Sequence, residues 1–456
     1  MRRRRLFGGL AALLVAVAGV VTVAAQPAQA AAGFTVSGSR ILEANGNAFV
    51  MRGVNHAHTW YADKLGSLAD IKALGANTVR VVLSSGDRWT RNEASDVTNV
   101  ITQCKTNRLI CVLEVHDTTG YGEDGAATTL ARAVDYWISI KSALAGQERY
   151  VILNIGNEPY GNTNAAGWVA DTKNAITRLR AAGFEHSIMV DAPNWGQDWS
   201  FTMRDNAASV FATDPQRNTI FSIHMYGVFD TAAEINDYLG RFITAGLPIV
   251  VGEFGHNHSD GNPDEDTILA TAQSRGIGYL GWSWSGNGGG VEYLDMVTNF
   301  NASALTSWGQ RLFNGANGIK ATSREATIYG GTQPTTPTTP PTSPTTPPTS
   351  PSTPPAGRQC TATYAVTGSW GGGFQGAVTV TAGSAAITSW TVTWTWPSGQ
   401  QFTNTWNASV TSSGSAITAR NMSYNGSVPA GGSTSWGFTA SYTGTNTAPT
   451  ATCTAA

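Results

Sequence analysis

The stretch VILNIGNEPY, residues 151–160, is typical of a buried strand that ends in reactive side chains. Its first half is an apolar run rich in Val, Ile and Leu, and it stops at Asn157 and Glu158, just before a proline. A second stretch, PIVVGEF at residues 248–254, repeats this design with an apolar run, a glycine and then Glu253. The two stretches predict a pair of carboxylates at the ends of two strands.

Apolar strand-like runs of this kind recur along the first part of the chain, with helical stretches between them. We expect eight strands, at residues 49–54, 78–83, 109–115, 151–155, 187–191, 220–224, 248–252 and 278–282, after a hairpin near residues 34–41. Strict alternation of strand and helix indicates an α/β fold, the (β/α)8 TIM barrel, whose chemistry lies at the C-terminal ends of the strands. We place this catalytic domain at residues 33–330.

Unusual polar and aromatic residues fall at the expected C-terminal ends of these strands. They are Asn55, His56, His58, Arg80, His116, Asn157, Glu158, His224, Tyr226, Glu253, Trp282 and Trp284. Placement at one end of the barrel is what an active site predicts, although for any single histidine a structural role in the core remains a strong alternative.

Two glutamates over a barrel mouth suit glycoside hydrolysis, in which one acid protonates the leaving oxygen and one carboxylate attacks or activates water. We assign Glu158 as the acid/base, a role that needs a raised pKa, and Glu253, with Arg80 and Tyr226 in reach, as the ionised nucleophile. Carboxyl groups about 5 to 5.5 Å apart would mean retention of configuration, and roughly 6.5 to 9.5 Å would mean inversion. Candidate sugar platforms are Trp60, Trp195 and Trp199, for which packing is an equal alternative.

The longer runs of this domain carry a family resemblance. RGVNHAHTWY (52–61), LEVHDTTGYGE (113–123), NIGNEPYGN (154–162), IVVGEFGH (249–256) and YLGWSWSGNGGGVEYLD (279–295) are similar to the bacterial endo-β-1,4-mannanases of glycoside hydrolase family 5. The resemblance implies retaining hydrolysis of internal β-1,4-mannosidic bonds in mannans, galactomannans and glucomannans, with no cofactor required. It also implies supporting roles for Arg80, His116, Asn157, His224, Tyr226 and Trp282, with Asn157 at the sugar 2-hydroxyl and Trp282 under the sugar ring.

Other functions are weighed against this one. A cellulase (endo-β-1,4-glucanase) of the same clan is the alternative within enzymes. A metal-dependent amidohydrolase, suggested by the His56-x-His58 pair, lacks further ligands at the ends of the fourth and fifth strands. A wall-binding protein with an inert barrel would have lost a strand-end glutamate, and both are present.

The acidic loop SDGNPDED, residues 259–266, suggests a structural calcium site, since Ca²⁺ prefers oxygen ligands. The candidate ligands are Asp260, Asp264, Glu265 and Asp266. Alternatively the loop starts a helix, because acidic residues favour a first helical turn.

The N-terminus predicts export of the protein. Four arginines at positions 2–5, an apolar run and the small-residue site at residues 28–30 indicate a secretory signal peptide over residues 1–30, with cleavage as late as position 32. Removing those arginines leaves 28 − 4 = 24 basic against 30 acidic residues, a net charge of −6, which argues against a nucleic-acid partner. We expect a secreted, extracellular monomer with no membrane association after signal removal.

Four cysteines in an oxidising compartment favour disulfides. Their spacing suggests Cys104 with Cys111 and Cys360 with Cys453, although four cysteines allow three connectivities.

Residues 334–355 contain only Pro, Thr and Ser, ten of these twenty-two being Pro, which predicts an extended spacer within a linker at residues 331–356. Residues 357–456 contain no Asp, Glu or Lys, yet they hold six tryptophans. Alternating β-rich runs between Gly, Ser and Asn turns indicate an antiparallel β-sandwich in this last part. We expect Trp390 and Trp394 in its core.

The runs WGGGFQGAVTVT (370–381) and SWTVTWTWPSGQQ (389–401) resemble a family 2 carbohydrate-binding module, with Cys360 and Cys453 at the bridging positions of that family. The resemblance implies binding of cellulose or another insoluble plant-wall polysaccharide. Its aromatic strip maps to Trp370, Trp406 and Tyr424, the last standing where tryptophan is usual.

Overall fold

The computed structural model describes residues 33–331, 359–397, 399–406, 408–422, 425–426, 428 and 430–455. The predicted signal peptide and, apart from Gly331, the predicted linker lie outside these residues. The chain divides into two compact units within that linker, and each is described by itself. No helix of the described residues is long and apolar enough to cross a membrane.

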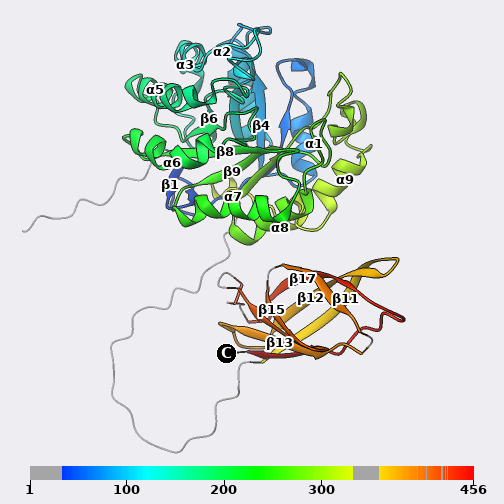
Figure 1. Ribbon diagram of the computed structural model, residues 1–456. Coiled ribbons are helices and arrows are strands. Elements are labelled where there is room, and N and C mark those ends of the chain that lie inside the picture. Colours follow the sequence, from blue (N-terminus) through cyan, green and yellow to red (C-terminus); the bar gives the residue numbers. More distant parts are fainter. Residues whose placement is uncertain are drawn as a thin grey trace, which may run out of the picture. The chain divides into compact units, whose positions relative to one another are not determined.

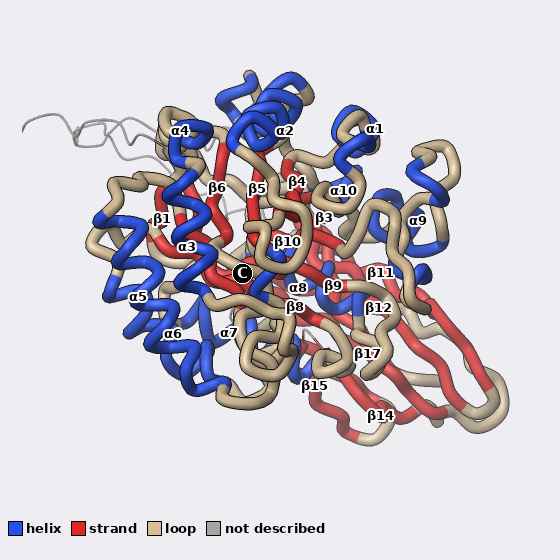
Figure 2. Tube along the Cα trace, turned by 90° about the horizontal axis from the view of Figure 1, so that it is seen from above, coloured by secondary structure: helices blue, strands red, loops and turns tan. Residues whose placement is uncertain are grey.

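The first unit is a closed barrel of parallel strands with helices around its outside, visible from the side (Figure 1) and from above (Figure 2). Around the barrel the strand order is β10-β3-β4-β5-β6-β7-β8-β9. The strands are β3 (Arg52–His56), β4 (Thr78–Leu83), β5 (Ile110–Val115), β6 (Val151–Asn154), β7 (Ile188–Asp191), β8 (Thr219–Met225), β9 (Ile249–Phe254) and β10 (Gly278–Gly281). The predicted (β/α)8 barrel is confirmed.

Helices connect the barrel strands and follow the last one. They are α1 (Ser67–Ala73), α2 (Ala94–Thr106), α3 (Leu130–Ser139), α4 (Lys141–Leu144), α5 (Trp168–Ala181), α6 (Thr202–Thr213), α7 (Ala232–Thr244), α8 (Glu265–Arg275), α9 (Ser307–Asn314) and α10 (Ile319–Thr322). Short 3₁₀ helices are η1 (Ala62–Lys64), η2 (His116–Thr118), η3 (Ala165–Gly167), η4 (Glu292–Leu294), η5 (Thr298–Phe300) and η6 (Thr327–Tyr329). Threonine side chains cap α3, α7 and α9, as the sequence pattern favours.

Side-chain alternation along the strands decides which residues face the barrel interior. In β5, Cys111 and Leu113 pack in the core between barrel and helices, whereas Ile110 and Val112 belong to a separate apolar layer inside the barrel. That inner layer also contains Phe34, so it is continuous with the antiparallel hairpin of β1 (Thr35–Ser37) and β2 (Arg40–Leu42). Residues two positions beyond this inner layer also point into the barrel. They lie nearer the mouth at the C-terminal ends of the strands, away from the hairpin.

Strand β9 breaks this alternation with a β-bulge. Its pairing with β8 shifts between Ile223 and His224, so that His224 lies opposite Glu253. Val250 belongs to the inner apolar layer, and simple alternation from it would send residue 253 outward. The extra residue, Gly252, turns Glu253 into the mouth of the barrel instead.

The second unit consists of two four-stranded antiparallel sheets, ordered β11-β12-β17-β14 and β15-β16-β13-β18. Its strands are β11 (Cys360–Trp370), β12 (Gly373–Ala382), β13 (Trp390–Thr395), β14 (Gln401–Trp406), β15 (Ala408–Ser413), β16 (Ala416–Asn421), β17 (Ser433–Ser441) and β18 (Thr452–Ala455). Trp390 and Trp394 are buried as predicted, and Trp394 stacks on Trp436 at 5.6 Å between ring centroids. The predicted antiparallel β fold is confirmed.

Both expected disulfides are formed. Cys104 in α2 is bonded to Cys111 in β5, which joins a helix to the adjoining barrel strand. Cys360 is bonded to Cys453 and joins β11 to β18, which lie in different sheets of the second unit.

Candidate active site

Arg80 is the centre of the site. It is the third residue of β4, it is fully buried, and each of its five N–H donors has an acceptor. Nε donates to Asn154 (2.8 Å); Nη1 donates to Asn55 (2.9 Å) and Glu253 (2.8 Å); Nη2 donates to Asn157 (2.6 Å) and Asp191 (2.9 Å). One guanidinium on β4 thus ties together the ends of four other barrel strands, β3, β6, β7 and β9, or the residues that follow them.

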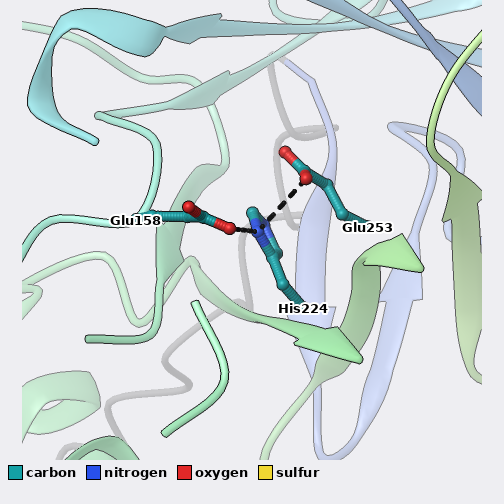
Figure 3. Close-up of side chains that lie close together, drawn as sticks. All are labelled: Glu158, His224 and Glu253. Atoms are coloured by element: carbon teal, nitrogen blue, oxygen red, sulfur yellow. Dashed lines mark hydrogen bonds and ion pairs between the residues drawn. The ribbon is translucent and has the colours of Figure 1, made fainter. Parts of the chain in front are cut away.

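The two glutamates predicted from the sequence meet at His224, which lies between them in Figure 3. His224 Nδ1 is 2.7 Å from Glu158 Oε1 and 3.6 Å from Glu253 Oε2. One carboxylate oxygen of Glu158 and one of Glu253 lie within 4.8 Å of each other. The pair converges at the barrel mouth.

The neighbours of the two glutamates differ. Glu253 accepts hydrogen bonds from Arg80 Nη1 and from the Tyr226 hydroxyl (2.9 Å), two donors that favour a carboxylate anion. Among the described residues, the Glu158 carboxylate has one polar partner, His224. The Glu158 backbone takes a left-handed conformation with φ 39°, which a non-glycine residue adopts only when its surroundings impose it.

The electrostatics of the cluster follow from burial and charge. Burial alone would lower the pKa of His224, but Glu253 and Asp191 outweigh it and raise that pKa to about 10. Burial likewise would raise the pKa of Asp191, yet Arg80 and His224 hold it well below the usual range. Arg80 and His224 are therefore cations, and Asp191 is an anion, at neutral pH.

The pKa of Glu253 departs from the expectation that Arg80 keeps it low. Burial raises this pKa, while His224 and Arg80 oppose the rise. The Tyr226 hydroxyl has its own pKa raised well above 10, by burial and by Glu253, so it remains a hydrogen-bond donor. Burial outweighs the opposing charges, so the pKa of Glu253 is raised overall, and Arg80, His224 and the Tyr226 hydroxyl are the groups that favour its anionic form.

Aromatic rings line one side of the mouth. His116 stacks on Trp282 with 5.6 Å between ring centroids and meets Trp60 edge-on at 5.2 Å. Trp89 joins this cluster at 5.7 Å from His116, although the sequence patterns do not single it out. The Trp282 N–H donates to Asn287 (2.9 Å), which fixes the plane of the indole.

The structure also places the remaining predicted site residues. Both groups of the Asn157 amide are engaged, the oxygen by Arg80 and the nitrogen with Thr119 (2.9 Å). His116 Nδ1 lies 2.9 Å from Glu114; burial lowers the pKa of His116, but Glu114 and Glu253 raise it overall. Glu114 and Asp191 are buried carboxylates near the ends of β5 and β7 that are not among the predicted site residues, although they follow the same pattern of an apolar strand ending in a carboxylate.

Three of the strand-end residues do not join the site. His56 contacts the Lys64 carbonyl (3.2 Å) and His58 contacts Asp96 (3.0 Å), so this pair gives no support to a metal-dependent amidohydrolase. Trp284 is fully buried and packs against Phe313. His56, His58 and Trp284 are therefore structural residues; for the two histidines this is the alternative that the sequence analysis allows.

The proposed calcium loop finds no support, because its carboxylates have protein partners. Asp264 caps helix α8 by accepting from the Thr267 N–H (2.9 Å), and Asp266 accepts from Arg311 (2.6 Å). Asp260 accepts from Gln197 (2.7 Å). Asp264 is the N-cap of α8 and Glu265 and Asp266 form its first turn, so this part of the loop begins a helix, as the alternative interpretation holds.

Among the described residues, one group of three has donor atoms close enough to hold a metal ion, namely Glu158, His224 and Glu253. Two features argue against an ion there. His224 Nδ1 is already hydrogen-bonded to Glu158 (2.7 Å), and Glu253 is already paired with the Arg80 guanidinium (2.8 Å).

Two opposed carboxylates, with a guanidinium on one of them, over the mouth of a (β/α)8 barrel define a glycoside hydrolase. Residues 42–288, more than half of the chain, match the family described as Cellulase (glycosyl hydrolase family 5). The chain belongs to glycosyl hydrolase family 5. Residues 360–455 match the family described as Cellulose binding domain.

Similar proteins agree with this membership. A mannan endo-1,4-beta-mannosidase of Streptomyces lividans is 68% identical over 320 residues, which cover 70% of this chain and 83% of that protein. One from Cellvibrio japonicus is 55% identical over 72% of this chain and 75% of its own length. The solved structure of a beta-mannanase from Thermomonospora fusca has 63% identity and a TM-score of 0.65, covering 65% of this chain and 99% of that one.

The predicted binding strip of the second unit is Trp370, Trp406 and Tyr424. Trp370 ends β11 and Trp406 ends β14, but their side chains, and Tyr424 entirely, lie outside the described residues.

Proposed function

We propose that this chain is a mannan endo-1,4-β-mannosidase that acts by a retaining double displacement, with Glu158 as acid/base and Glu253 as nucleophile. The observation that carries the mechanism is the approach of the two carboxylates to within 4.8 Å at one oxygen of each. An inverting enzyme needs room for a water between its carboxyl groups, roughly 6.5 to 9.5 Å.

The chemistry runs in two steps. In the first, Glu253 attacks the anomeric carbon, the bond to the leaving oxygen breaks, and the proton of Glu158 passes to that oxygen. In the second, Glu158 takes a proton from water, the water oxygen attacks the same carbon, and the ester bond to Glu253 breaks. The product keeps its configuration, and both carboxyl groups return to their starting states.

The charges around the pair support this division of roles. Arg80 pairs with Glu253 and Asp191, His224 lies beside Glu158 and Asp191, and His116 lies beside Glu114. Among the described residues, the Glu158 carboxylate is hydrogen-bonded to His224 alone, whereas Glu253 is bonded to both Arg80 and Tyr226, so the nucleophile is the more firmly held of the two carboxylates. Arg80 and Tyr226 hold Glu253 in place for attack.

The preference for mannan is proposed from the names of the relatives. Two are named mannan endo-1,4-beta-mannosidase, and a third is named beta-mannanase/endoglucanase A. Related structures are titled mannotriose and mannohexaose complexes. Reducing-sugar release from galactomannan and from carboxymethylcellulose, measured side by side, separates a mannanase from a glucanase.

Two variants test the mechanism on pure linear mannan. Glu253→Ala should abolish activity on every substrate, whereas Glu158→Ala should spare the first step for a 2,4-dinitrophenyl glycoside, whose leaving group needs no proton. Glu325→Gln, at a glutamate paired with Lys72 and Arg108, is the matched control. Proton NMR of the first-formed anomer decides retention; an initial inverted product refutes the mechanism.

We also propose that the chain is exported and that residues 357–456 attach the enzyme to cellulose or a related insoluble polysaccharide. The signal-like N-terminus and the family 2 resemblance of the second unit support these statements. Sequencing the N-terminus of protein recovered from culture medium tests the first. Loss of cellulose pull-down in the full-length Trp370→Ala and Trp406→Ala variants tests the second.

A further inference from the structure

The side-chain amide of Asn157 is held at both of its ends. Asn157 follows β6, and its Oδ1 accepts a hydrogen bond from Arg80 Nη2 (2.6 Å). Its Nδ2 donates to the hydroxyl of Thr119 (2.9 Å), a residue that follows β5 and the 3₁₀ helix η2. Asn157 is 1% exposed, so both contacts lie in a buried setting, where a mispaired polar group is costly. Thr119 is not among the residues that the sequence patterns single out.

The hydroxyl of Thr119 can serve the Asn157 amide only as an acceptor. Its single proton is donated to the His116 carbonyl oxygen (2.6 Å), which leaves lone pairs of Oγ1 to face the amide. On the other side, a guanidinium has donors and no acceptor, so Arg80 can face only the amide oxygen. One orientation of the amide therefore satisfies both neighbours. Turning it over would set its NH₂ group against Arg80 and its oxygen against the Thr119 lone pairs.

This orientation leaves one N–H of the Asn157 amide for a ligand. The amide nitrogen carries two hydrogens, and the Thr119 hydroxyl accepts one of them. Within the part of the chain that the structure describes, Thr119 is the one hydrogen-bond partner of that nitrogen. The direction of the second N–H is set by the same two contacts, since together they fix the plane of the amide.

Thr119 belongs to a segment that also holds the backbone after β6. The Thr118 hydroxyl donates to the Asn157 carbonyl oxygen (2.6 Å), and the Gly120 N–H donates to the Glu158 carbonyl oxygen (3.0 Å). These bonds help to impose the left-handed backbone of Glu158, with its φ of 39°. The neighbours of Thr119 thus fix the backbone of Asn157 and Glu158, and the Thr119 side chain adds the orientation of the amide.

We propose that Thr119 is a positioning residue, which orients the Asn157 amide so that its second N–H meets the 2-hydroxyl of the sugar transferred to Glu253. The inference rests on the proposed function and on the place at this hydroxyl that the family resemblance implies for Asn157. Hydrogen bonds to the 2-hydroxyl strengthen as the oxocarbenium-like transition state forms. A loosened amide should therefore slow formation of the glycosyl-enzyme, and it should do so for substrates that carry this hydroxyl.

The test compares two donors that differ by one hydroxyl. The full-length enzyme is given 2,4-dinitrophenyl β-mannobioside, or the analogue that lacks the 2-hydroxyl on the sugar bound to dinitrophenol. Because this leaving group needs no proton from Glu158, kcat/KM for its release reports formation of the glycosyl-enzyme. The ratio of the two kcat/KM values cancels the fraction of enzyme that is folded, so a loss of stability alone leaves the ratio unchanged.

Thr119→Val keeps the shape of the side chain and removes its hydroxyl. The ratio of kcat/KM for the mannobioside to kcat/KM for its deoxy analogue should fall roughly three- to tenfold, the scale of one hydrogen bond. The loss should fall on the donor that has the 2-hydroxyl, because the deoxy analogue gives the Asn157 amide nothing to bind. Thr119→Ser, which keeps the hydroxyl, should restore most of the ratio.

Thr322→Val is the matched control, because the Thr322 hydroxyl makes a corresponding pair of contacts at the other end of the barrel. It donates to the Gly318 carbonyl oxygen (2.8 Å) and accepts from Nε of Arg52 (3.0 Å), the first residue of β3. Its ratio should equal that of the wild type. A wild-type ratio in Thr119→Val, or a lowered ratio that Thr119→Ser does not restore, overturns the inference while the proposed function stands. A wild type that releases dinitrophenol from neither donor overturns both.

Discussion

Replacing Arg80 by lysine tests whether one guanidinium organises the active site. The substitution keeps the positive charge but reduces five N–H donors in a fixed fork to three on one nitrogen. At least two of the five acceptors around Arg80 then lose their partner in a buried setting. Each unsatisfied buried acceptor costs about 1 to 3 kcal/mol, so the free energy of unfolding of the barrel should fall by about 2 to 6 kcal/mol.

Activity should fall further than stability explains. Arg80 orients Glu253, and a displacement of about 1 Å at a reacting group costs on the order of 100-fold in rate. Urea denaturation followed by tryptophan fluorescence gives the first quantity, and kcat/KM on linear mannan below the unfolding transition gives the second.

Arg180→Lys provides the control for this pair of measurements. Arg180 also donates five hydrogen bonds, to Asp214 and to three backbone carbonyls, outside the active site. Its substitution should cost comparable stability and leave kcat/KM unchanged. If Arg80→Lys keeps more than half of the wild-type kcat/KM, or loses less than about 1 kcal/mol, the central role of Arg80 is refuted.

Three further predictions concern other features. Because the folded-state pKa of His224 is raised to about 10, its contribution to the free energy of unfolding is complete below about pH 6.5 and is lost as pH rises toward 10. The difference in free energy of unfolding between wild type and His224→Gln should therefore narrow over that range. A difference that stays constant with pH contradicts this prediction. Gly252→Ala places a Cβ 2.2 Å from Ser222 Oγ, so it should cost about 1 to 3 kcal/mol in denaturation and most of the activity; an active, equally stable variant would show that the strand yields. Reducing the Cys360–Cys453 disulfide, which closes 93 residues, should destabilise the second unit by about 4 to 5 kcal/mol in calorimetry, and an unchanged Tm for that unit would contradict this.

The barrel and its principal site residues were accessible from the sequence because periodicity encodes them. Strand-like runs alternating with helical ones specify the (β/α)8 fold, and parallel strands bring their C-terminal ends to one mouth. The structure brings Glu158, Glu253, Arg80 and His224 together, as that rule predicts for strand-end residues, but Glu253 faces the mouth only because of the bulge at Gly252.

Other parts of the site depend on contacts that periodicity does not encode. Asp191 and Glu114 lie in strands that read as buried, and a carboxylate is favourable there because of basic partners from other strands or loops, namely Arg80 and His224 for Asp191, and His116 and Arg80 for Glu114. Trp89 stands in a loop, where its meeting with His116 depends on loop conformation. Conversely, His56 and His58 lie at the end of a strand as the rule requires, but they are buried structural residues. Their ring nitrogens contact the Lys64 carbonyl and the Asp96 carboxylate.

The bulge at Gly252 separates the part of β9 that packs in the barrel core from the part that carries the active-site glutamate. Val250, before the bulge, packs in the barrel interior, and Glu253, after it, is the proposed nucleophile. The inserted residue Gly252 thus lies between a residue of the core and a residue of the active site. A lineage that lost this residue would retain pairing on both sides of β9 yet turn its glutamate toward the helices. Deleting Gly252 should therefore abolish the activity of this chain while the barrel remains folded.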